Sequence, residues 1–382
     1  MNAPRENIEL VKLIDRLEKK YGKLQGNSGR IFITRLSAGY GKIRRLYFSL
    51  YGGRPKSRKR FDQLLFSLFE NYCNRPEILK KLDLNRSKNP LWLEHQKWVG
   101  MSLYPSHFSQ DLKSLEKKTE YFEELGINVV HLMPPFDIPD GPNDGGYAVK
   151  NYRKVRPDLG KMSDIRSISR RFRKKGILLA LDLVLNHTSD QHQWAKKAKA
   201  GNKKYQEYYY MFPDRAIPDQ FESHMPEVFP ETAPGNFTHL QKVDKWVMTV
   251  FNDYQWDLNY NNPQVLNEMV DTLLFLANQG VDIIRLDAPA FIWKEIGTSC
   301  QNLPETHKIL QLMKACAEIV APGVKFLAEA IVAPLEIVKY FGEGSNSECD
   351  IAYNATFMAL IWESLATSKT RLLVRSLSKL PP

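Results

Sequence analysis

Three stretches decide the fold: ILLALDLVLNH at 177–187, VDIIRLDA at 281–288 and VKFLAEA at 324–330. Each is a nearly continuous apolar run that ends in a side chain capable of chemistry. Such runs are typical of parallel strands, because helices cover both faces of a parallel sheet. The three stretches therefore predict buried parallel strands whose polar side chains gather at one edge of the sheet.

Three further runs of the same kind occur, at VGMSLYP (99–105), INVVHLMPP (127–135) and DIAYN (350–354). Between the runs, helical patterns cover 113–124, 163–174, 264–279 and 304–320, and we expect a last helix at about 355–379. Alternating strands and helices form either an open doubly wound sheet or a closed barrel.

The polar residues at the strand ends favour the barrel. They are His131, His187, Asp287, Glu329 and Tyr353, and (β/α)8 barrels build their sites from residues in such positions. The glycine-rich turn that follows the first strand of a doubly wound fold is missing from this sequence. The predicted fold is therefore an α/β TIM-type barrel that is incomplete, with about six of its eight strands.

Two other regions accompany the barrel. Residues 1–92 show helical periodicity at 7–21 and 61–72, which predicts a helical N-terminal domain. Residues 188–262 are too many for a simple crossover and are rich in Pro, Gly and aromatic residues, which predicts an inserted domain after the third strand. The barrel domain then comprises 93–187 and 263–382.

The composition is that of a folded globular protein, with 43% hydrophobic and 25% charged residues. We expect no membrane-spanning segment, because no run of about 18 apolar residues occurs. Four widely spaced cysteines, at 73, 300, 316 and 349, predict reduced thiols in a cytoplasmic protein rather than disulfides or a zinc site.

The net charge of +11 is concentrated in the first 90 residues, which hold 21 Lys and Arg against 8 Asp and Glu. A solvated helical surface and an anionic partner such as nucleic acid are both compatible with this charge. We favour the solvated surface, because no recognised nucleic-acid-binding motif accompanies the charge. The densest run, RPKSRKR at 54–60, predicts a loop.

Candidate chemistry centres on Arg285, Asp287 and Glu329. Arg285 and Asp287 are two residues apart on one strand, so their side chains point to the same side, and Glu329 follows a neighbouring strand about 4.8 Å away. Retaining glycosidases need two carboxyl groups ~5–5.5 Å apart, one to attack the anomeric carbon and one to protonate the leaving oxygen. The strand spacing fits that requirement.

Each of these residues also has a structural interpretation. Arg285 and Asp287 could form a buried ion pair, Glu329 could cap the following helix, and His187 could be a hydrogen-bonded core histidine. The joint pattern favours a catalytic site, because four strands deliver such groups at their carboxyl ends.

Longer motifs add a family resemblance. DLVLNH (182–187), IIRLDA (283–288) and LAEA (327–330) resemble the first three of the four ordered motifs of the α-amylase superfamily, glycoside hydrolase family thirteen. Within that family the amylosucrases are the most similar branch, through DGGYAV (144–149), FNDYQWDLNY (251–260), FIWKEIGTSCQNLP (291–304) and FLAEAIV (326–332). The resemblance covers nearly the whole chain.

The resemblance implies three catalytic roles. Asp287 would be the nucleophile, Glu329 the general acid and base, and Arg285 the residue that keeps the nucleophile ionised and oriented. Calcium-binding amylases use the equivalent of Asn186 as a ligand, but the amylosucrases resemble the calcium-free branch. The resemblance therefore implies no metal or other cofactor, and a structural role for Asn186.

It also implies a substrate site of five residues. Asp144, Tyr147 and His187 would hold the glucosyl ring, and Phe251 and Ile331 would line the neighbouring subsite. Plain core packing is the structural alternative for Tyr147 and Phe251, and for Phe251 it is an equally valid interpretation.

The implied activity is retaining α-glucosyl transfer from sucrose, which releases fructose and extends an α-1,4-glucan acceptor through a covalent glucosyl-enzyme. Sucrose hydrolysis, phosphorolysis and other glycosidase activities of the superfamily stay open as alternatives. A non-catalytic, amylase-like binding protein is a further alternative.

One departure from the family pattern concerns the fourth motif, a His-Asp pair after strand seven. The sequence stops at Pro382, after the sixth strand and its helix. We therefore expect a truncated chain without strands seven and eight, whose own sucrose-cleaving activity is small or absent, because several preorganised groups would be lost together.

Overall fold

The computed structural model describes residues 3–22, 26–94, 97–344 and 346–378. At its centre lies a parallel six-stranded sheet in the order β1-β2-β5-β11-β12-β15. Its strands are β1 (Gly100–Leu103), β2 (Val129–Leu132), β5 (Leu178–Val184), β11 (Ile283–Asp287), β12 (Lys325–Ala328) and β15 (Ile351–Ala352). All six lie within the apolar runs found in the sequence, so the predicted incomplete (β/α)8 barrel is confirmed.

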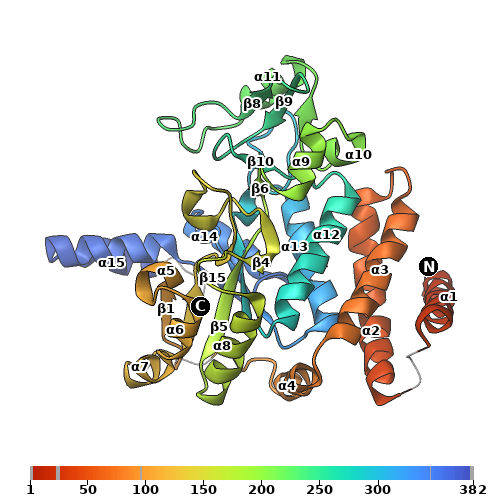
Figure 1. The fold of residues 1–382 in the computed structure, drawn as a ribbon, viewed down its shortest axis with the longest axis horizontal. Coiled ribbons are helices and arrows are strands. Elements are labelled where there is room, and N and C mark those ends of the chain that lie inside the picture. Colours follow the sequence, from red (N-terminus) through yellow and green to blue (C-terminus); the bar gives the residue numbers. More distant parts are fainter. Residues whose placement is uncertain (1–2, 23–25, 95–96, 345, 379–382) are drawn as a thin grey trace.

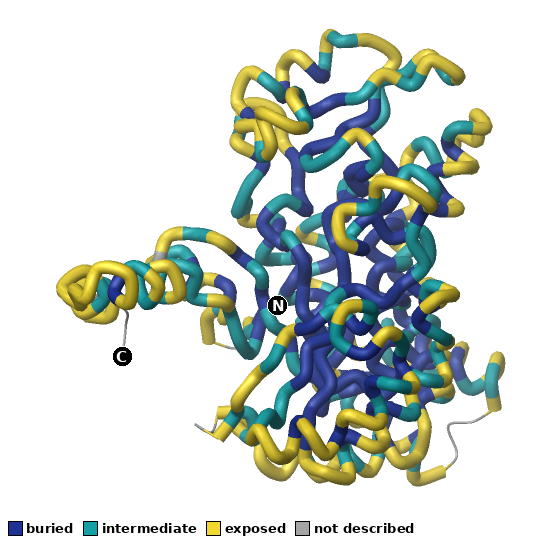
Figure 2. The backbone as a smooth tube through the Cα atoms, turned by 60° about the vertical axis from the view of Figure 1, so that its left-hand side comes forward, coloured by how far each residue is buried: buried dark blue, intermediate teal, exposed yellow. Residues whose placement is uncertain are grey.

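Helices follow the strands as a barrel requires (Figure 1). They are α5 (Pro105–Phe108), α6 (Leu112–Glu116), α7 (Thr119–Glu124), α8 (Met162–Lys174), α12 (Pro263–Asn278), α13 (Pro304–Val320), α14 (Pro334–Ile337), α15 (Ala355–Thr367) and α16 (Arg371–Leu377). Burial is deepest along the central strands, where every residue of β5 and β11 is buried (Figure 2).

Two predicted helices are each broken in two. The helix expected at 113–124 is α6 followed by α7. The helix expected at 355–379 is α15 followed by α16, because Ser368 takes a left-handed conformation with φ 56° that ends α15; residue 379 lies outside the described residues. Neither break was visible in the apolar periodicity, which continues across both turns.

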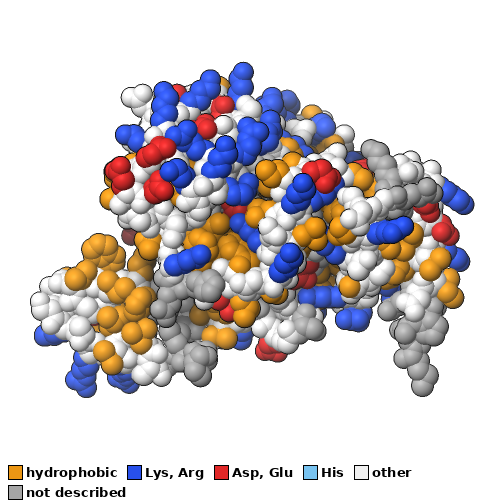
Figure 3. Space-filling view, turned by 90° about the horizontal axis from the view of Figure 1, so that it is seen from below, with side chains coloured by type: hydrophobic (Ala, Val, Ile, Leu, Met, Phe, Trp, Pro, Cys, Tyr) orange, Lys and Arg blue, Asp and Glu red, His pale blue; other side chains and the backbone are white. Residues whose placement is uncertain are grey.

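The sheet is open within the described part of the chain, where β1 pairs with β2 and β15 pairs with β12. A cavity of about 710 Å³ is lined by residues of both edge strands, including Gly100–Ser102 and Ile351. Beyond this opening, α15 projects from the body, and Figure 3 shows hydrophobic side chains gathered on the projecting arm. Its exposed large apolar residues are Met358, Trp362, Leu365, Leu372, Val374 and Leu377.

Four helices precede the sheet: α1 (Ala3–Tyr21), α2 (Asn27–Tyr51), α3 (Ser57–Asn74) and α4 (Glu77–Ser87). The run at 54–60 is only half loop, since α3 begins at Ser57, and its arginines and lysines face solvent from the first turn. The sequence pattern missed α2, because three glycines interrupt it. One of them, Gly39, faces α13, where a Cβ would make an ordinary van der Waals contact with the Cδ1 of Ile319 at 3.4 Å.

These helices share one hydrophobic core with the barrel. Side chains of α2 and α3 also bond directly to the barrel layer, as when the Tyr51 hydroxyl donates to the carbonyl of Tyr260 (3.0 Å) and Ser67 donates to Asp271 (2.9 Å). The division at residue 92 into a separate N-terminal domain stays a prediction.

The stretch between β5 and α12 carries its own small elements. Near the barrel, β6 (His187–Ser189) pairs antiparallel with β10 (Gln255–Asp257). Farther out, β7 (Met211–Phe212), β8 (Phe237–Leu240) and β9 (Lys245–Met248) form an antiparallel sheet in the order β7-β9-β8, flanked by α9 (Gln193–Lys199), α10 (Lys203–Gln206) and α11 (Ala216–Glu222). The inserted domain at 188–262 stays a prediction in its boundaries.

Findings on membrane helices, metal-binding groups and cysteines complete the description. In the part of the chain described, no helix combines the length and the apolarity needed to cross a membrane. Within those same ranges, no group of three or more His, Cys, Asp or Glu side chains is placed to hold a metal ion. None of the four cysteines, at 73, 300, 316 and 349, takes part in a disulfide.

We expect the buried ion pair of Arg75 and Asp83 to fasten α4 to the barrel. The two side chains are joined at 2.6 Å, and Arg75 also donates to the carbonyl of Ala277 (3.1 Å). Asp83→Ala should lower the free energy of unfolding by about 3–5 kcal/mol, because it leaves a buried guanidinium without its carboxylate. The exposed pair of Glu77 and Lys80 is the matched control, and Glu77→Ala should cost less than about 1 kcal/mol. Equal losses in urea denaturation would contradict the assignment.

Candidate active site

One buried guanidinium organises the carboxyl edge of the sheet. Arg285, on β11, contacts the carboxylates of Asp182 on β5, of Asp287 on β11 itself and of Glu329 directly after β12. Its Nη1 atom lies 3.0 Å from Oδ1 of Asp287. Register explains the convergence, since Arg285 is paired with Asp182 across β11 and β5. The structure therefore brings together all three residues expected to carry the chemistry.

The network extends across the remaining strands. Asp182 also contacts His131 on β2, with 2.8 Å between Oδ2 and Nε2, and the other ring nitrogen of His131 lies 3.1 Å from the hydroxyl of Ser102 on β1. At the opposite edge, the ring of Tyr353 lies 5.7 Å from the guanidinium carbon of Arg285. Polar or aromatic groups from all six strands, or from the residue just after them, are thus linked through one chain of contacts.

The charges in the network are strongly interdependent. Burial alone would lower the pKa of Arg285, but the carboxylates around it outweigh burial and raise it, so the guanidinium stays charged. Burial raises the pKa of Asp287 well above its ordinary value, and the neighbouring carboxylate of Glu329 raises it further. The carboxyl group of Asp287, with Glu329 as its neighbour, therefore holds a proton more tightly than an isolated carboxyl would.

The carboxyl groups of Asp287 and Glu329 approach each other within hydrogen-bonding distance. Both groups contact the guanidinium of Arg285, which draws them together. Glu329 also accepts a hydrogen bond from the backbone N–H of Ala288 (3.3 Å), a residue in the left-handed conformation (φ 45°). The Glu329 side chain is 25% exposed, against 9% for Asp287 and 0% for Asp182.

Asp144 and Tyr147 are placed by a turn whose two glycines, Gly145 and Gly146, both have positive φ angles. The turn, η1 (Asp144–Gly146), lies between the paired strands β3 (Phe136–Asp137) and β4 (Asn151–Val155). Gly145 has φ 62°, and a Cβ there would lie 2.7 Å from the hydroxyl of Tyr104. The turn leaves the Tyr147 ring 5.6 Å from the guanidinium carbon of Arg285, so Tyr147 forms part of the floor beside the carboxylates.

Asp144 and His187 are joined by a residue that the sequence analysis did not single out, Gln255 on β10. The Gln255 amide donates to Oδ2 of Asp144 (3.0 Å) and lies 2.9 Å from Nε2 of His187. Burial lowers the pKa of His187 to about 4, so the ring is neutral at neutral pH and can accept from the amide. Phe251 packs against the His187 ring, with 5.2 Å between the centroids.

Ile331 is the one expected site residue that the structure does not bring into this cluster. Its side chain is 76% exposed, so no packing fixes it toward the carboxylates. Its place in a substrate subsite stays a prediction.

A second set of residues, absent from the sequence-based site, surrounds Asn186. The ammonium of Lys294 lies 3.1 Å from Oδ1 of Asn186, 2.8 Å from Oδ2 of Asp257 and 2.6 Å from the carbonyl oxygen of Phe291. The side chains of Lys294 and Asp257 are fully buried. The oxygen atoms around Asn186 are therefore already satisfied by a cation of the chain itself, and they do not fit a calcium ion.

The missed residues did leave a signal in the sequence. Asp182, Asp257 and Lys294 are charged residues inside otherwise apolar or aromatic stretches, where an unpaired charge is costly. Such residues must have partners. Which partners they have depends on strand pairing, which the sequence does not show.

A barrel sheet with two acidic side chains at its carboxyl edge is an architecture that acts on glycosidic bonds in many enzymes. Residues 86–380 match the family described as "Alpha amylase, catalytic domain". The chain therefore belongs to the α-amylase family, whose members are glycoside hydrolases and transglycosylases.

Among the curated relatives are a trehalose synthase/amylase and a glucosylglycerate phosphorylase. Trehalose synthase/amylase TreS of Mycolicibacterium smegmatis is 32% identical over 281 residues, which cover 71% of this chain and 45% of the relative. Glucosylglycerate phosphorylase of Spirochaeta thermophila is 32% identical over 337 residues, which cover 85% of this chain and 52% of the relative. The chain spans about half the length of the curated relatives it matches.

Solved structures show the same likeness. A mutant of MutB in complex with the substrate sucrose superposes with a TM-score of 0.60 and 27% identity, covering 69% of this chain and 49% of that one. These relatives establish the family, but they do not single out the amylosucrases.

We expect the stability of the protein to be independent of divalent metals, because Lys294 supplies the cation beside Asn186. Excess EDTA should leave the melting temperature unchanged. Lys294→Met should lower the free energy of unfolding by about 3–5 kcal/mol, since Asp257 would be left buried without its cation. Lys175→Met, which breaks an exposed pair with Glu123, is the matched control and should cost less than about 1 kcal/mol. A drop in melting temperature on adding EDTA to the unmodified protein would contradict this role of Lys294.

Proposed function

We propose that this chain carries the catalytic centre of a retaining α-glucoside-processing enzyme. The observation that supports the proposal best is the placement of two carboxyl groups, from Asp287 and Glu329, on one buried guanidinium at the carboxyl edge of a barrel sheet. Two such groups, one ionised and one protonated, are what the double displacement needs.

In the proposed first step, an oxygen of the Asp287 carboxylate attacks the anomeric carbon. The proton held between the two carboxyl groups passes from Glu329 to the glycosidic oxygen, and the bond to the leaving group breaks. Arg285 keeps a positive charge 3.0 Å from Asp287, which favours its ionised form once the proton has left. Glu329, now a carboxylate, then takes a proton from the acceptor hydroxyl, whose oxygen displaces Asp287 from the sugar.

The proposed donor is sucrose and the proposed acceptor an α-glucan, as in the amylosucrases. A terminal glucosyl ring would lie on Tyr147, with Asp144 and neutral His187 bonding to its hydroxyl groups and Phe251 closing the side of the site. The link through Gln255 supports this proposal, because it holds a carboxylate and an imidazole in fixed relative positions. The sucrose complex of MutB supports the choice of donor by family likeness.

Phosphorolysis is the second candidate. The match to glucosylglycerate phosphorylase extends over 85% of this chain, more than the match to the trehalose synthase/amylase. In that case phosphate would take the place of the acceptor hydroxyl in the second step, and the roles of Asp287 and Glu329 would be unchanged.

The two carboxylates should respond differently to substitution. Measured in the protein at its full natural length, Asp287→Asn should reduce the rate on every glucosyl donor by roughly 10⁴- to 10⁶-fold, because no covalent intermediate can form. Glu329→Gln should slow sucrose cleavage by about 10²- to 10⁴-fold but spare α-glucosyl fluoride, whose leaving group needs little protonation. Initial rates with both donors measure the difference. If the two variants lost the same factor on both donors, the roles would be wrongly assigned.

The products decide between the candidate activities. Incubated with sucrose alone, the intact protein should release fructose and form α-linked glucan, and chromatography of the products measures both. Glucose 1-phosphate formed only when inorganic phosphate is present would establish the phosphorylase. Free glucose in amounts equal to fructose would establish a hydrolase, and no product from sucrose under any condition would reject sucrose as the donor.

A further inference from the structure

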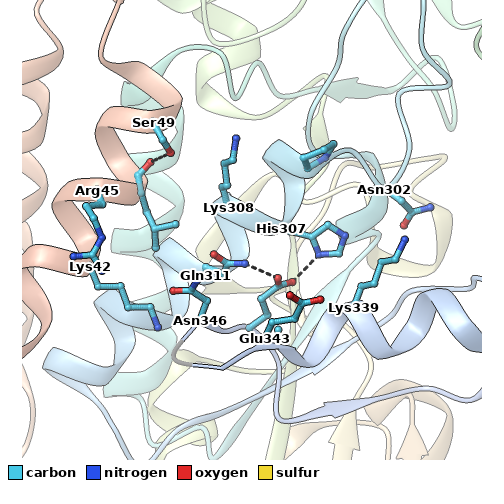
Figure 4. Close-up of a pocket in the computed structure, with 14 residues that line it drawn as sticks. Lys42, Arg45, Ser49, Asn302, His307, Lys308, Gln311, Lys339, Glu343 and Asn346 are labelled. Carbon is cyan, nitrogen blue, oxygen red and sulfur yellow. Dashed lines mark hydrogen bonds and ion pairs between the residues drawn. The ribbon is translucent and has the colours of Figure 1, made fainter. Parts of the chain in front are cut away.

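A cavity of about 640 Å³ opens between the N-terminal helices and the barrel layer, lined by other residues than those around Arg285 (Figure 4). Its walls come from α2, from the first turns of α13, from η3 (Val338–Phe341) and from the hairpin of β13 (Gly342–Glu343) and β14 (Asn346–Ser347). Two of these segments follow the carboxylate-bearing strands, since α13 comes after β11 and η3 after β12. A ligand in the cavity would therefore touch both segments and α2 at once.

The cavity has an excess of positive charge. Lys42 and Arg45 from α2, Lys308 from α13 and Lys339 from η3 all line it (Figure 4). The last two are paired with acidic residues of their own helical turns, but those pairs are partly exposed to solvent. Exposed pairs of this kind are weak, so the two ammonium groups can be shared with an incoming anion.

The two acidic residues in the lining, Glu343 and Glu348, offset only part of this charge, because four cationic groups face two carboxylates. Glu348 is 1% exposed, and its two carboxylate oxygens lie 2.8 Å from Nδ1 of His307 and 2.9 Å from Nε2 of Gln311. These contacts hold Glu348 in place within the wall of the cavity.

The positive region continues along the groove between α2 and α13. A neighbouring cavity of about 630 Å³ shares Lys42 and Arg45 and is also lined by Arg35. Burial lowers the pKa of Arg35, whose guanidinium is partly withdrawn from water. A partly buried cation favours a bound anion. The excess of Lys and Arg in the first 90 residues is thus brought in part to this face of α2.

The size and the other side chains of the cavity narrow the ligand class. Its volume lies in the range that holds small metabolites. The amides of Asn302 and Asn346 and the hydroxyl of Ser49 can bond to sugar hydroxyl groups. Among the described lining residues there is no Phe, Tyr or Trp to stack a nucleobase, which disfavours a nucleotide.

We propose that this cavity is a binding site for a sugar phosphate, separate from the catalytic site. Arg45, Lys308 and Lys339 hold the phosphate, and the amides of Asn302 and Asn346 bind the sugar. The proposal does not depend on which glucoside the catalytic site processes.

Calorimetric titration with glucose 6-phosphate as the probe tests the proposal. The variant Arg45→Glu with Lys339→Glu should raise the dissociation constant by about tenfold or more, the loss expected for removal of charge-assisted contacts. The matched control, Lys59→Glu with Arg170→Glu, makes the same charge change at exposed positions outside the cavity and should alter it by less than about twofold. Melting curves verify that both variants fold.

Four outcomes would overturn the proposal. Loss of binding in Asp144→Ala would place the probe in the glucosyl site, and unchanged binding in the Arg45→Glu, Lys339→Glu variant would place it elsewhere. If inorganic phosphate bound with the same affinity as glucose 6-phosphate, the sugar would contribute nothing to binding, and the proposed ligand class would be wrong. Titration without saturation in the unmodified protein would reject the site altogether, whereas saturable binding that weakens with added salt and persists in Asp144→Ala supports it.

Discussion

The contact on which the rest of the structure depends is the one between the Arg285 guanidinium and three carboxylates. These come from β5, from β11 and from the end of β12, so the contact can form only if those strands are adjacent and in their observed register. A shift of one residue would turn Asp182 to the opposite face of the sheet. The same buried charge cluster therefore specifies the sheet and defines the site.

Burying so many charges costs free energy of desolvation, and contacts with surrounding side chains limit that cost. Asp182 has a second partner in His131, and Ser102 completes the chain at the first strand. Lys294 likewise gives the buried carboxylate of Asp257 a partner of opposite charge. Within this network of charged groups, the Nε of Arg285 has no hydrogen-bond partner among the described residues. Buried ionic networks are rarely an efficient source of stability, and their retention at one edge of the sheet fits a functional role.

The sequence was sufficient for the sheet because parallel strands leave a simple signature. Every strand is an apolar run, and the runs end in polar residues where a site can form. The same logic brought Arg285, Asp287 and Glu329 together correctly. It could not find Gln255 or Lys294, because their partners lie 68 and 108 residues away and depend on how the outer strands and loops fold back. The helix α2 escaped for a different reason, since three glycines interrupt its sequence pattern and resemble helix breakers.

The open sheet also sets up a gradient of local stability. Backbone amides of β5 and β11 are bonded on both sides and lie in the deepest part of the core, whereas one side of β1 and one side of β15 have no strand partner in the described chain. Opening of the outer strands therefore requires far less of the structure to unfold than opening of the central pair. Amide hydrogens should exchange with solvent first at the two edges and last beside Arg285, so the most persistent part of this protein is also the part that carries its charge cluster.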